Sequence, residues 1–489
     1  MKKLYFALDR FCGKRWFPLI FIPLATCFLL LYSYTTSPLF LNDGMDSAVF
    51  KTMGLAILKG KIPYVDIFDH KGPVLYFIDA LGQWMIPGRM GIFLLQVIGL
   101  SVALFYMFKT ARLFVGNALS FLVILFTLFI FGGIIQEGNQ CEEWMMYFFT
   151  VALYYALKYF VNDSGSPHPM KYSLFYGFCF GMSFFIRPND AVAMMGGLMT
   201  GVTIWSVYNK EYKNALLNAL CFGAGFLLVA VPIVCYFAWN NALGDLWYGL
   251  IGFNNTYSGG IISMLLSLLG RRKESLLLLF VILGVMAYDT RYKDVLFIVV
   301  PMMVLGIVLL GISYYRHYYI VFIPIFVIYF VLLLLQNKSI MAIAIVVFCF
   351  SLQADVLKSF VNLALKDMRW KIEMLRSEKD FIGSFYEESD KLLSHIPENE
   401  KDEVWNYNLG WEDRKSSFSV LYHFGIVQCN LITCGADDKL LNIDDVAKKM
   451  PLWVVMERKE NDNIVLPSRY DLVAKTDTTI CKIELYRRK

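Results

Sequence analysis

The chain has 489 residues, of which 57% are hydrophobic and only 17% are Asp, Glu, Lys or Arg. A soluble globular protein carries about 25% charged residues, so this chain has too few to cover a water-exposed surface. Residues 354–489 hold 21 Lys and Arg and 24 Asp and Glu, whereas residues 1–353 hold 24 and 16. This distribution excludes a single soluble domain, a disordered chain and a nucleic-acid-binding protein of the ordinary type.

Long apolar stretches fill the charge-poor part. A helix needs about 20 apolar residues to cross the hydrocarbon core of a membrane. Counting shorter stretches as well, we expect about eleven transmembrane helices within residues 1–353 and hence a polytopic α-helical membrane protein. The predicted spans are 17–36, 91–108, 113–135, 144–157, 172–186, 191–208, 215–239, 275–288, 295–313, 318–335 and 340–352.

Cations near the first span predict its orientation. Five of them precede it: Lys2, Lys3, Arg10, Lys14 and Arg15. By the positive-inside rule they hold the N-terminus in the cytoplasm. No small-residue cleavage site ends the apolar stretch, so we expect an uncleaved anchor and not a signal peptide. An odd number of crossings then places residues 354–489 outside the cytoplasm.

The same alternation of crossings puts four polar segments on the outer side: 41–89, 136–143, 240–273 and 313–319. Arg271, Arg272 and Lys273 break the positive-inside pattern there. Either the number of predicted membrane crossings before that stretch is wrong by one, or these cations bind an anionic ligand at the outer interface. Ionisable residues are rare inside the predicted helices, Asp79 and Arg187 being exceptions near helix ends. The chemistry is therefore predicted at one face of the membrane and not across it.

The first outer loop, residues 37–90, contains a short predicted helix. Asp46 precedes an apolar stretch that ends at Gly60, which predicts a helix with an acidic cap and a glycine stop. Its apolar side chains fall on one side, a pattern typical of helices that lie on the membrane interface. Asp46 is thus either a helix cap or a functional carboxylate.

The second half of this loop gathers ionisable groups. Asp66, Asp69, His70 and Lys71 come directly before Gly72 and Pro73, which turn the chain into another apolar stretch. Charged groups next to a bilayer are costly unless they serve a function. A base and a phosphate-binding cation are the functional interpretation, and a solvated loop anchored by aromatic residues is the structural one.

This loop resembles a known family. The sequence Pro-Tyr-x-Asp-x-Phe-Asp-His-Lys-Gly-Pro-x-Leu-Tyr at 63–76, preceded by Asp46, is similar to the first extracytoplasmic loop of GT-C superfamily glycosyltransferases. Among them it most resembles bacterial family 39 and RgtA/B-like proteins, which are related to protein O-mannosyltransferases and aminoarabinose transferases. Weaker similarity extends to Glu142-Glu143, to 185–189 and to 317–319, and covers most of residues 10–353.

The resemblance implies a fold and roles for individual residues. It implies a GT-C fold in which Asp46 is the general base that deprotonates the acceptor hydroxyl. Lys71 matches a cation that binds the lipid phosphate of the donor. Either Glu142 or Glu143 matches a second acidic residue beside the acceptor. The family's Asp-Glu pair is Asp46-Ser47 here, which leaves Asp43 as an alternative base.

Other candidates are less specific. Arg187 is either an interfacial anchor or a contact for phosphate or sugar, and the pair Arg316 and His317 is either part of an aromatic belt or a phosphate-binding pair. We also count His70 among the donor-phosphate ligands and Asp69 among the acidic residues near the acceptor. No His or Cys cluster has zinc-ligand spacing. A divalent cation held by acidic loop residues and the donor phosphate is an open possibility.

The charge-rich part, 354–489, is predicted to be a small extracytoplasmic α/β domain. A long helix is expected at 355–395, strands at 403–407 and 451–456, a helix at 418–424 and a hairpin at 470–486. The role of this domain does not follow from its sequence.

These observations predict a glycosyltransferase in a bacterial inner membrane. It would transfer a hexosyl or pentosyl group from a polyprenyl-phosphate donor to a lipid-linked or envelope glycan acceptor, with inversion as the family implies. One alternative is a glycan polymerase or ligase with a polyprenyl-diphosphate donor. The other is a lipid or glycan flippase without enzymatic activity. The expected partners are the donor, the acceptor and membrane lipids, and no nucleic acid.

Overall fold

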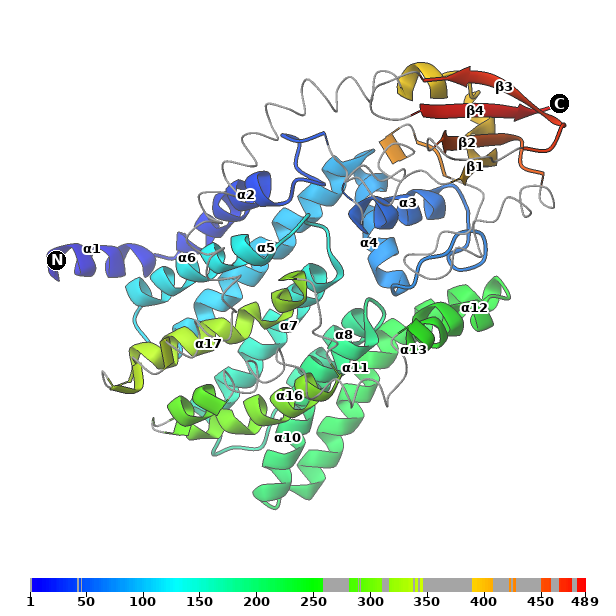
Figure 1. The fold of residues 1–489 in the computed structure, drawn as a ribbon. Helices are drawn as coiled ribbons and strands as arrows, with labels where there is room; N and C mark the ends of the chain where they lie inside the picture. Colours follow the sequence, from blue (N-terminus) through cyan, green and yellow to red (C-terminus); the bar gives the residue numbers. More distant parts are fainter. Residues whose placement is uncertain are drawn as a thin grey trace.

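The computed structural model forms a bundle of helices with a small β-sheet at one end (Figure 1). It describes residues 2–41, 44, 46–257, 281–288, 290, 292–309, 316–336, 339–341, 344–345, 389–407, 422–423, 425–427, 450–458, 466–476 and 482–489. Asp43 and the cations at 271–273 lie outside these residues, so the predictions for them stay untested.

The helical part is a succession of long and short helices. Its first half consists of α1 (Lys2–Cys12), η1 (Phe17–Ile20), α2 (Phe21–Tyr32), α3 (Asp46–Leu58), α4 (Pro73–Met85), α5 (Arg89–Ala111), α6 (Asn117–Ile134) and α7 (Cys141–Lys158). Its second half consists of η2 (Tyr159–Asp163), α8 (Met170–Phe184), α9 (Pro188–Ala191), η3 (Val192–Gly196), α10 (Gly197–Tyr208), α11 (Tyr212–Trp239), α12 (Leu243–Trp247), η4 (Tyr248–Gly252), α13 (Phe253–Tyr257), η6 (Lys293–Val295), α16 (Leu296–Leu309), η7 (Arg316–Phe322) and α17 (Ile323–Leu334).

Several of these helices have the length and composition of membrane spans. Among the described residues, five qualify: Arg89–Ala111, Asn117–Ile134, Pro188–Tyr208, Tyr212–Trp239 and His317–Leu334. A sixth is obtained if the bent pair of Lys2–Cys12 and Phe17–Tyr32 is counted as one span. Helices α8 and α16 cover two further predicted stretches, but they are only 15 and 14 residues long. The chain is therefore a mostly helical membrane protein, and the count of eleven spans stays a prediction.

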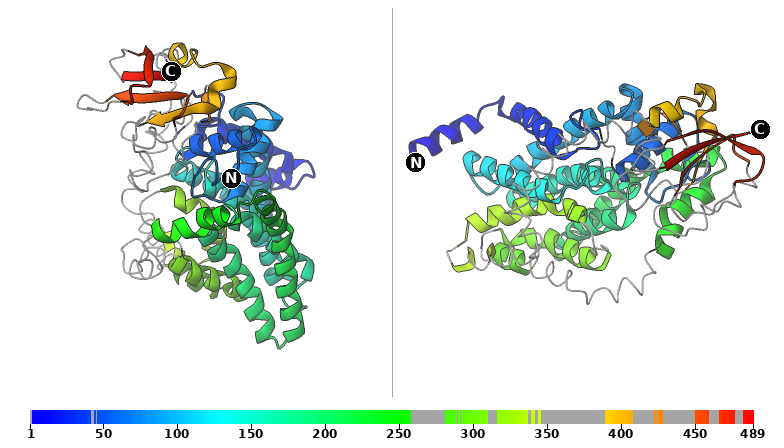
Figure 2. Two further views of the ribbon diagram at one scale, coloured as in Figure 1. Left: turned by 90° about the vertical axis from the view of Figure 1, so that its right-hand side faces the viewer. Right: turned by 45° about the horizontal axis from the view of Figure 1, so that its top comes forward.

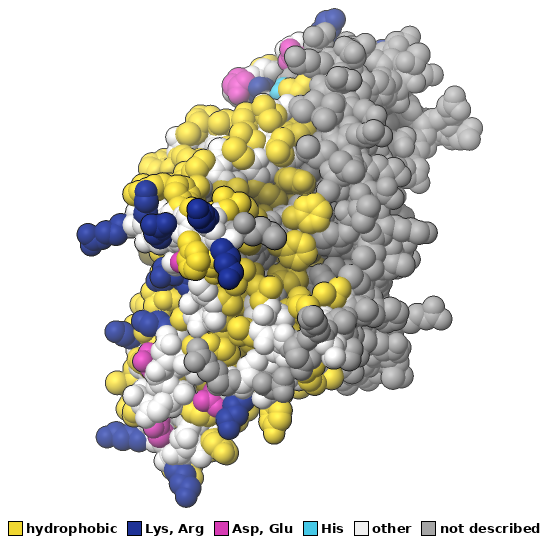
Figure 3. Space-filling view, turned by 90° about the vertical axis from the view of Figure 1, so that its left-hand side faces the viewer, with side chains coloured by type: hydrophobic (Ala, Val, Ile, Leu, Met, Phe, Trp, Pro, Cys, Tyr) yellow, Lys and Arg dark blue, Asp and Glu magenta, His cyan; other side chains and the backbone are white. Residues whose placement is uncertain are grey.

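The N-terminal helix α1 turns sharply away from the helix that follows it. The two meet at 96°. Asp9 fixes α1 to the bundle, because its carboxylate accepts a hydrogen bond of 2.9 Å from the backbone N–H of Ala118 at the start of α6. Viewed from this side, Figure 3 shows Lys and Arg side chains gathered on the surface with hydrophobic side chains between them. This is the face that the positive-inside rule predicts to be cytoplasmic.

Helices α8 and α11 pack with their backbones in close contact. A Cβ atom on Gly177 would lie 1.9 Å from the carbonyl oxygen of Phe222, and one on Gly225 would lie 2.0 Å from that of Leu174. Only glycine fits at both positions. Small residues that allow such an approach are typical of helix pairs in membranes, where apolar side chains gain little from leaving lipid.

A four-stranded sheet forms the C-terminal part. Strands β1 (Val404–Tyr407), β2 (Trp453–Arg458), β3 (Tyr470–Lys475) and β4 (Lys482–Arg488) lie in the order β1-β2-β4-β3. β1 and β2 are parallel and the other pairs are antiparallel. The strands predicted at 403–407 and 451–456 and the hairpin at 470–486 are confirmed. The helices predicted at 355–395 and 418–424 fall mostly outside the described residues.

Helix α3 differs from the sequence-based expectation. It begins at Asp46, its last residue is Leu58, and Gly60 has a left-handed φ of 79°, as expected for a glycine stop. It does not lie exposed on the membrane interface, however. Its polar side chains Ser47, Lys51 and Thr52 are buried along with its apolar ones. The amphipathic interpretation was wrong because polar partners from other segments cover this helix.

Candidate functional site

The first-loop motif packs directly against a second motif. The backbone N–H of Gly72 donates to the carbonyl of Ile186 at 2.9 Å, and that of Val74 donates to Phe185 at 3.0 Å. A Cβ atom on Gly72 would lie 2.1 Å from the Phe185 carbonyl oxygen, so only glycine fits. The two sequence motifs at 63–76 and 185–189 therefore form one structural unit.

Asp69 organises the interior of the loop. It is fully buried, and the Tyr76 hydroxyl is 2.8 Å from its Oδ2 atom. Its Oδ1 atom lies 3.3 Å from Nδ1 of His70. Burial raises the pKa of Asp69, but the hydrogen bond of His70 and the charge of Lys71 outweigh burial and hold this pKa well below its usual range. The carboxylate is therefore ionised and enclosed by its neighbours, and its predicted place near the acceptor stays a prediction.

Lys71 is the cation of this loop. Its Nζ atom lies 2.8 Å from Nε2 of His70. An ammonium group can only donate, so this geometry requires Nε2 to be unprotonated and Nδ1, on the Asp69 side, to carry the hydrogen. Burial and the charge of Arg187 lower the pKa of Lys71, whereas the negative charges of Asp69 and Asp46 raise it, and the pKa lies above its usual value. Lys71 is a permanent positive charge.

Two tyrosines and an asparagine hold the backbone around Lys71. The Tyr64 hydroxyl donates to the Lys71 carbonyl at 2.6 Å, and the Tyr76 hydroxyl accepts a bond of 3.0 Å from the Lys71 N–H. The Asn254 amide donates to the His70 carbonyl at 2.9 Å. The sequence contained a signal for Tyr76, which ends the motif, but none for Asn254, which lies 184 positions away from its partner.

Arg187 forms a second charged cluster beside the loop. It is the N-cap residue of the short helix α9, whose first helical residue is Pro188, where the missing N–H of proline is tolerated. The Nη1 atom pairs with Glu142 and with Asp190, at 3.2 Å in the second case. The guanidinium lies over the Tyr318 ring, 4.4 Å from its centroid. Both carboxylates are buried, whereas 23% of the Arg187 side chain is exposed.

The two adjacent glutamates of α7 point to different places. Both lie in the first turn, where the helix dipole favours carboxylates. Glu142 pairs with Arg187. Glu143 is fully buried and accepts hydrogen bonds from the Gln96 amide at 2.9 Å and from the Tyr147 hydroxyl. The structure thus brings Glu142 to the charged cluster and places Glu143 inside the bundle.

Asp46 and His317 complete the cluster. Asp46 is exposed at the start of α3 and interacts electrostatically with Lys71 and His317. His317 Nδ1 lies 2.7 Å from Gln136 Oε1, an atom that can only accept, so Nδ1 carries the proton. The backbone of Arg316 lies in η7, but its side chain is outside the described part of the chain.

A buried network lies under the start of α3. The Asn139 amide donates to Asp79 Oδ2 at 3.1 Å and reaches Ser47 Oγ at 3.3 Å, while the Trp144 indole donates to Asn139 at 2.9 Å. Asp79 is fully buried, and burial raises its pKa to about 7, an effect that the Asn139 hydrogen bond and the Lys51 charge only partly offset. This network ties α3 and α4 to the loop before α7.

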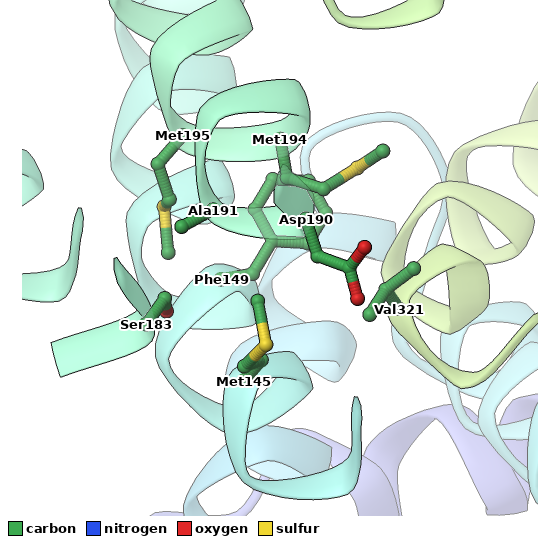
Figure 4. Close-up of a pocket in the computed structure, with 8 residues that line it drawn as sticks. All are labelled: Met145, Phe149, Ser183, Asp190, Ala191, Met194, Met195 and Val321. Atoms are coloured by element: carbon green, nitrogen blue, oxygen red, sulfur yellow. The ribbon is translucent and has the colours of Figure 1, made fainter. Parts of the chain in front are cut away.

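A small cavity lies behind Asp190 (Figure 4). Figure 4 shows the Asp190 carboxylate turned toward Val321. The lining residues are Met145, Phe149, Ser183, Asp190, Ala191, Met194, Met195 and Val321. The volume of about 10 Å³ is room for about one water molecule, so this cavity is too small for a sugar. Within the described ranges, no group of three or more His, Cys, Asp or Glu side chains is arranged to hold a metal ion.

Comparisons with known proteins give a weak likeness. No family model matches the sequence, and no curated protein matches it. The Archaeoglobus fulgidus oligosaccharyltransferase with zinc and sulfate aligns at 12% identity and a TM-score of 0.43, over 89% of this chain and 68% of that one. The same enzyme without ligand aligns at 10% identity and a TM-score of 0.44, over 91% and 70%.

A third match is the archaeal oligosaccharyltransferase AglB from the same organism with an inhibitory peptide and a dolichol-phosphate. It has 11% identity and a TM-score of 0.44, over 91% of this chain and 69% of that one. A TM-score below 0.5 does not establish a shared fold, so the proposal below rests on the residues of this chain. These matches also do not bear on the narrower resemblance to family 39 and RgtA/B-like proteins, which stays a prediction.

Proposed function

We propose that this protein is a GT-C membrane glycosyltransferase that transfers a sugar from a polyprenyl-phosphate donor to an extracytoplasmic lipid-linked or envelope glycan acceptor. The observation that carries the proposal is the convergence of an exposed carboxylate, Asp46, with a permanent cation, Lys71, beside the Arg187 cluster. A base for the acceptor and a cation for the leaving phosphate are the two groups that such a transfer needs.

In the proposed reaction, Asp46 takes the proton of the acceptor hydroxyl. The acceptor oxygen attacks the anomeric carbon, and the bond between this carbon and the phosphate oxygen breaks. The electron pair of that bond stays on the polyprenyl phosphate, where Lys71 stabilises the added negative charge. His70 and Asp69 hold the Lys71 ammonium in place, since His70 accepts its hydrogen bond. Attack from the side opposite the phosphate inverts the anomeric centre.

Arg187 has a different proposed role from Lys71. Two carboxylates already compensate its charge, so it attracts a donor phosphate less strongly than Lys71 does. We assign the pair of Arg187 and Glu142 to the acceptor side, where the exposed part of the guanidinium and the Tyr318 ring would contact hydroxyl groups. His317 lies next to this side through Tyr318, its ring 4.6 Å from the tyrosine ring.

The proposal places the site at the outer face of a bacterial inner membrane, with the N-terminus in the cytoplasm. Its support is the five cations in and just after α1, before the first predicted span. Figure 3 shows Lys and Arg side chains on the face of the molecule that it views. A donor whose lipid tail is anchored in the bilayer presents its phosphate at headgroup level. A site at the ends of membrane helices can reach that phosphate without extracting the lipid.

The test uses the purified protein in lipid nanodiscs. It is incubated with polyprenyl-phosphate and polyprenyl-diphosphate sugars and with lipid-linked glycan acceptors, and released polyprenyl phosphate and acceptor mass are measured. The proposal predicts one glycosylated acceptor for each polyprenyl monophosphate released. A requirement for diphosphate donors would instead indicate a polymerase or ligase. Vectorial movement of labelled lipid in proteoliposomes without bond formation would indicate a flippase.

A further inference from the structure

We propose that the C-terminal unit, meaning the described residues from Ser389 onward, is a structural part of the candidate site because it holds helix α3 in place. Figure 1 and both views of Figure 2 show the sheet beside the segment that contains α3 and α4. Helix α3 begins at Asp46, so whatever fixes this helix also fixes the proposed base. Only the consequence for catalysis rests on the proposed function.

The first contact is at the C-terminal end of α3. Lys59 Nζ lies 2.6 Å from Asp402 Oδ1 and donates to the carbonyl of Gly425 at 2.9 Å. Gly425 has a left-handed φ of 69°, which an L side chain rarely adopts. The side chains of Lys59 and Asp402 are 25% and 38% exposed. An exposed ion pair of this kind contributes little to stability, so this contact alone would not hold the helix.

The second contact is inside the protein. Lys51 is fully buried, and its ammonium donates to the carbonyl of Thr35 at 2.8 Å. The ring of Tyr422 covers it, with 5.0 Å between Nζ and the ring centroid. A buried ammonium is costly unless nearby groups compensate its charge, and the electron-rich face of a desolvated aromatic ring supplies part of that compensation. Tyr422 therefore both excludes water from Lys51 and stabilises its charge.

Apolar packing joins the same two parts in both directions. Val427, from the C-terminal unit, is 1% exposed and belongs to the apolar core that contains Val49, Phe50 and Met53 of α3. Leu41, from the segment before α3, packs in turn against the core of the C-terminal unit. The sheet is therefore continuous with the membrane part through buried side chains, and it is not a loosely tethered appendage.

The opposite side of α3 is held by α4. A Cβ atom on Gly54 would lie 2.7 Å from the backbone nitrogen of Ala80, so the two helices touch backbone to backbone. The Gln83 amide donates to the Lys51 carbonyl at 2.9 Å. Helix α3 thus contacts both α4 and the C-terminal unit, and loosening the C-terminal contact removes one of its supports.

The experiment compares Tyr422→Ala with Tyr422→Phe in the full-length protein in nanodiscs. The phenylalanine variant keeps the ring over Lys51 and the alanine variant removes it. Asp471→Asn is the matched control, because Asp471 pairs with Lys489 at 3.0 Å on the exposed surface of β3. Hydrogen exchange of peptides covering residues 46–58 and amine labelling of Lys51 are followed by mass spectrometry.

We expect Tyr422→Ala to speed hydrogen exchange in α3 by about tenfold or more and to make Lys51 reactive, because local opening then costs less free energy. Tyr422→Phe and Asp471→Asn should behave like the wild type. Asp402→Asn, which removes only the exposed contact, should change exchange about twofold or less. Unchanged exchange in Tyr422→Ala, or an equal change in Tyr422→Phe, would overturn the proposal.

The transfer assay separates this inference from the proposed function. If α3 loosens as expected but no donor supports transfer by the wild type, the proposed function fails and the structural role stands. If the wild type is active and Tyr422→Ala leaves both exchange and turnover unchanged, the structural role fails and the function stands. If the structural role and the proposed function both hold, Tyr422→Ala should lower kcat more than it changes KM for the donor. The reason is that the variant displaces Asp46 and not the donor-binding Lys71.

Discussion

In the described helical part, the polar cluster around His168 and the one around His70 differ in charge and exposure. One surrounds His168, which is 1% exposed and shares hydrogen bonds with Asn218 and Ser173, while Ser173 also donates to Asn218. The other is the loop of Asp69, His70 and Lys71. The His168 cluster is neutral and closed, since burial lowers the pKa of His168 to about 4.

The contrast indicates which cluster can react. Each polar atom of a closed neutral network is satisfied by its neighbours, so the network orders the local chain and offers nothing to a ligand. The loop of Asp69, His70 and Lys71 is charged, and beside it lie an exposed carboxylate, Asp46, and a partly exposed cation, Arg187. Charges at membrane depth are retained where they serve function. The predictions below test this division.

Lys71 should give the largest effect. Lys71→Met removes the charge that stabilises the leaving phosphate, and we expect transfer to fall about 10²- to 10³-fold. Lys71→Arg, which keeps the positive charge, should retain part of the transfer activity that Lys71→Met loses. Lys210→Met, which removes an exposed lysine from the turn between α10 and α11, is the control and should keep wild-type turnover. Equal turnover of Lys71→Met and the control would assign the cluster a structural role.

Asp79 should make stability depend on pH. Its pKa is raised to about 7 in the folded protein, above its unfolded value of about 4. The unfolded chain therefore loses this proton first as pH rises, so the folded state loses stability between about pH 4 and pH 7. Asp79→Asn does not titrate. As pH rises from 5 to 8, the melting temperature of Asp79→Asn should therefore increase relative to that of the wild type. The change in this difference should correspond to about 1 to 3 kcal/mol of unfolding free energy. A constant difference across this range would contradict the buried ionisation.

The neighbouring glutamates should separate activity from stability. Glu142→Gln loosens Arg187, and we expect about a tenfold loss of transfer, because positioning errors at a site reduce rates strongly. Glu143→Gln changes a buried network with Gln96, so it should lower the melting temperature and affect transfer less. Kinetics normalised to folded protein measure both. A larger kinetic loss in Glu143→Gln would reverse the assignment.

His168 should give the smallest effect on transfer. His168→Leu leaves the buried Asn218 and Ser173 side chains without one partner, which costs about 1 to 3 kcal/mol of stability. Turnover per folded molecule should stay at the wild-type value. Thermal unfolding and the transfer assay together check this, and a loss of turnover beyond the loss of folded protein would mean that the closed cluster also acts in function.

The sequence predicted local features well. Apolar stretches located the helices, and Asp46 and Gly60 located the start and the stop of α3, because these signals depend only on neighbouring residues. The strands and the hairpin of the C-terminal part followed from alternation for the same reason. The first-loop motif indicated the region of the candidate site.

Long-range contacts were not predictable in this way. No periodicity reports that Gly72 hydrogen-bonds to Ile186, or that Tyr422 covers Lys51 from the other end of the chain. The helical pattern of α3 suggested an exposed polar face because the partners of that face are remote in sequence. The sequence alone does not distinguish Glu142 from Glu143. Only the direction in which each side chain leaves the first turn of α7 distinguishes them.

The most direct test of the central claim is the turnover of Asp46→Asn. The variant keeps the size of the side chain and removes the base. Wild type, Asp46→Asn and the control Asp245→Asn, which changes an exposed carboxylate of α12, are compared in the transfer assay with the donor that the wild type uses best. We predict a loss of about 10²- to 10⁴-fold for Asp46→Asn and none for the control. Wild-type turnover in Asp46→Asn would contradict the assignment of the base and of the site built around it.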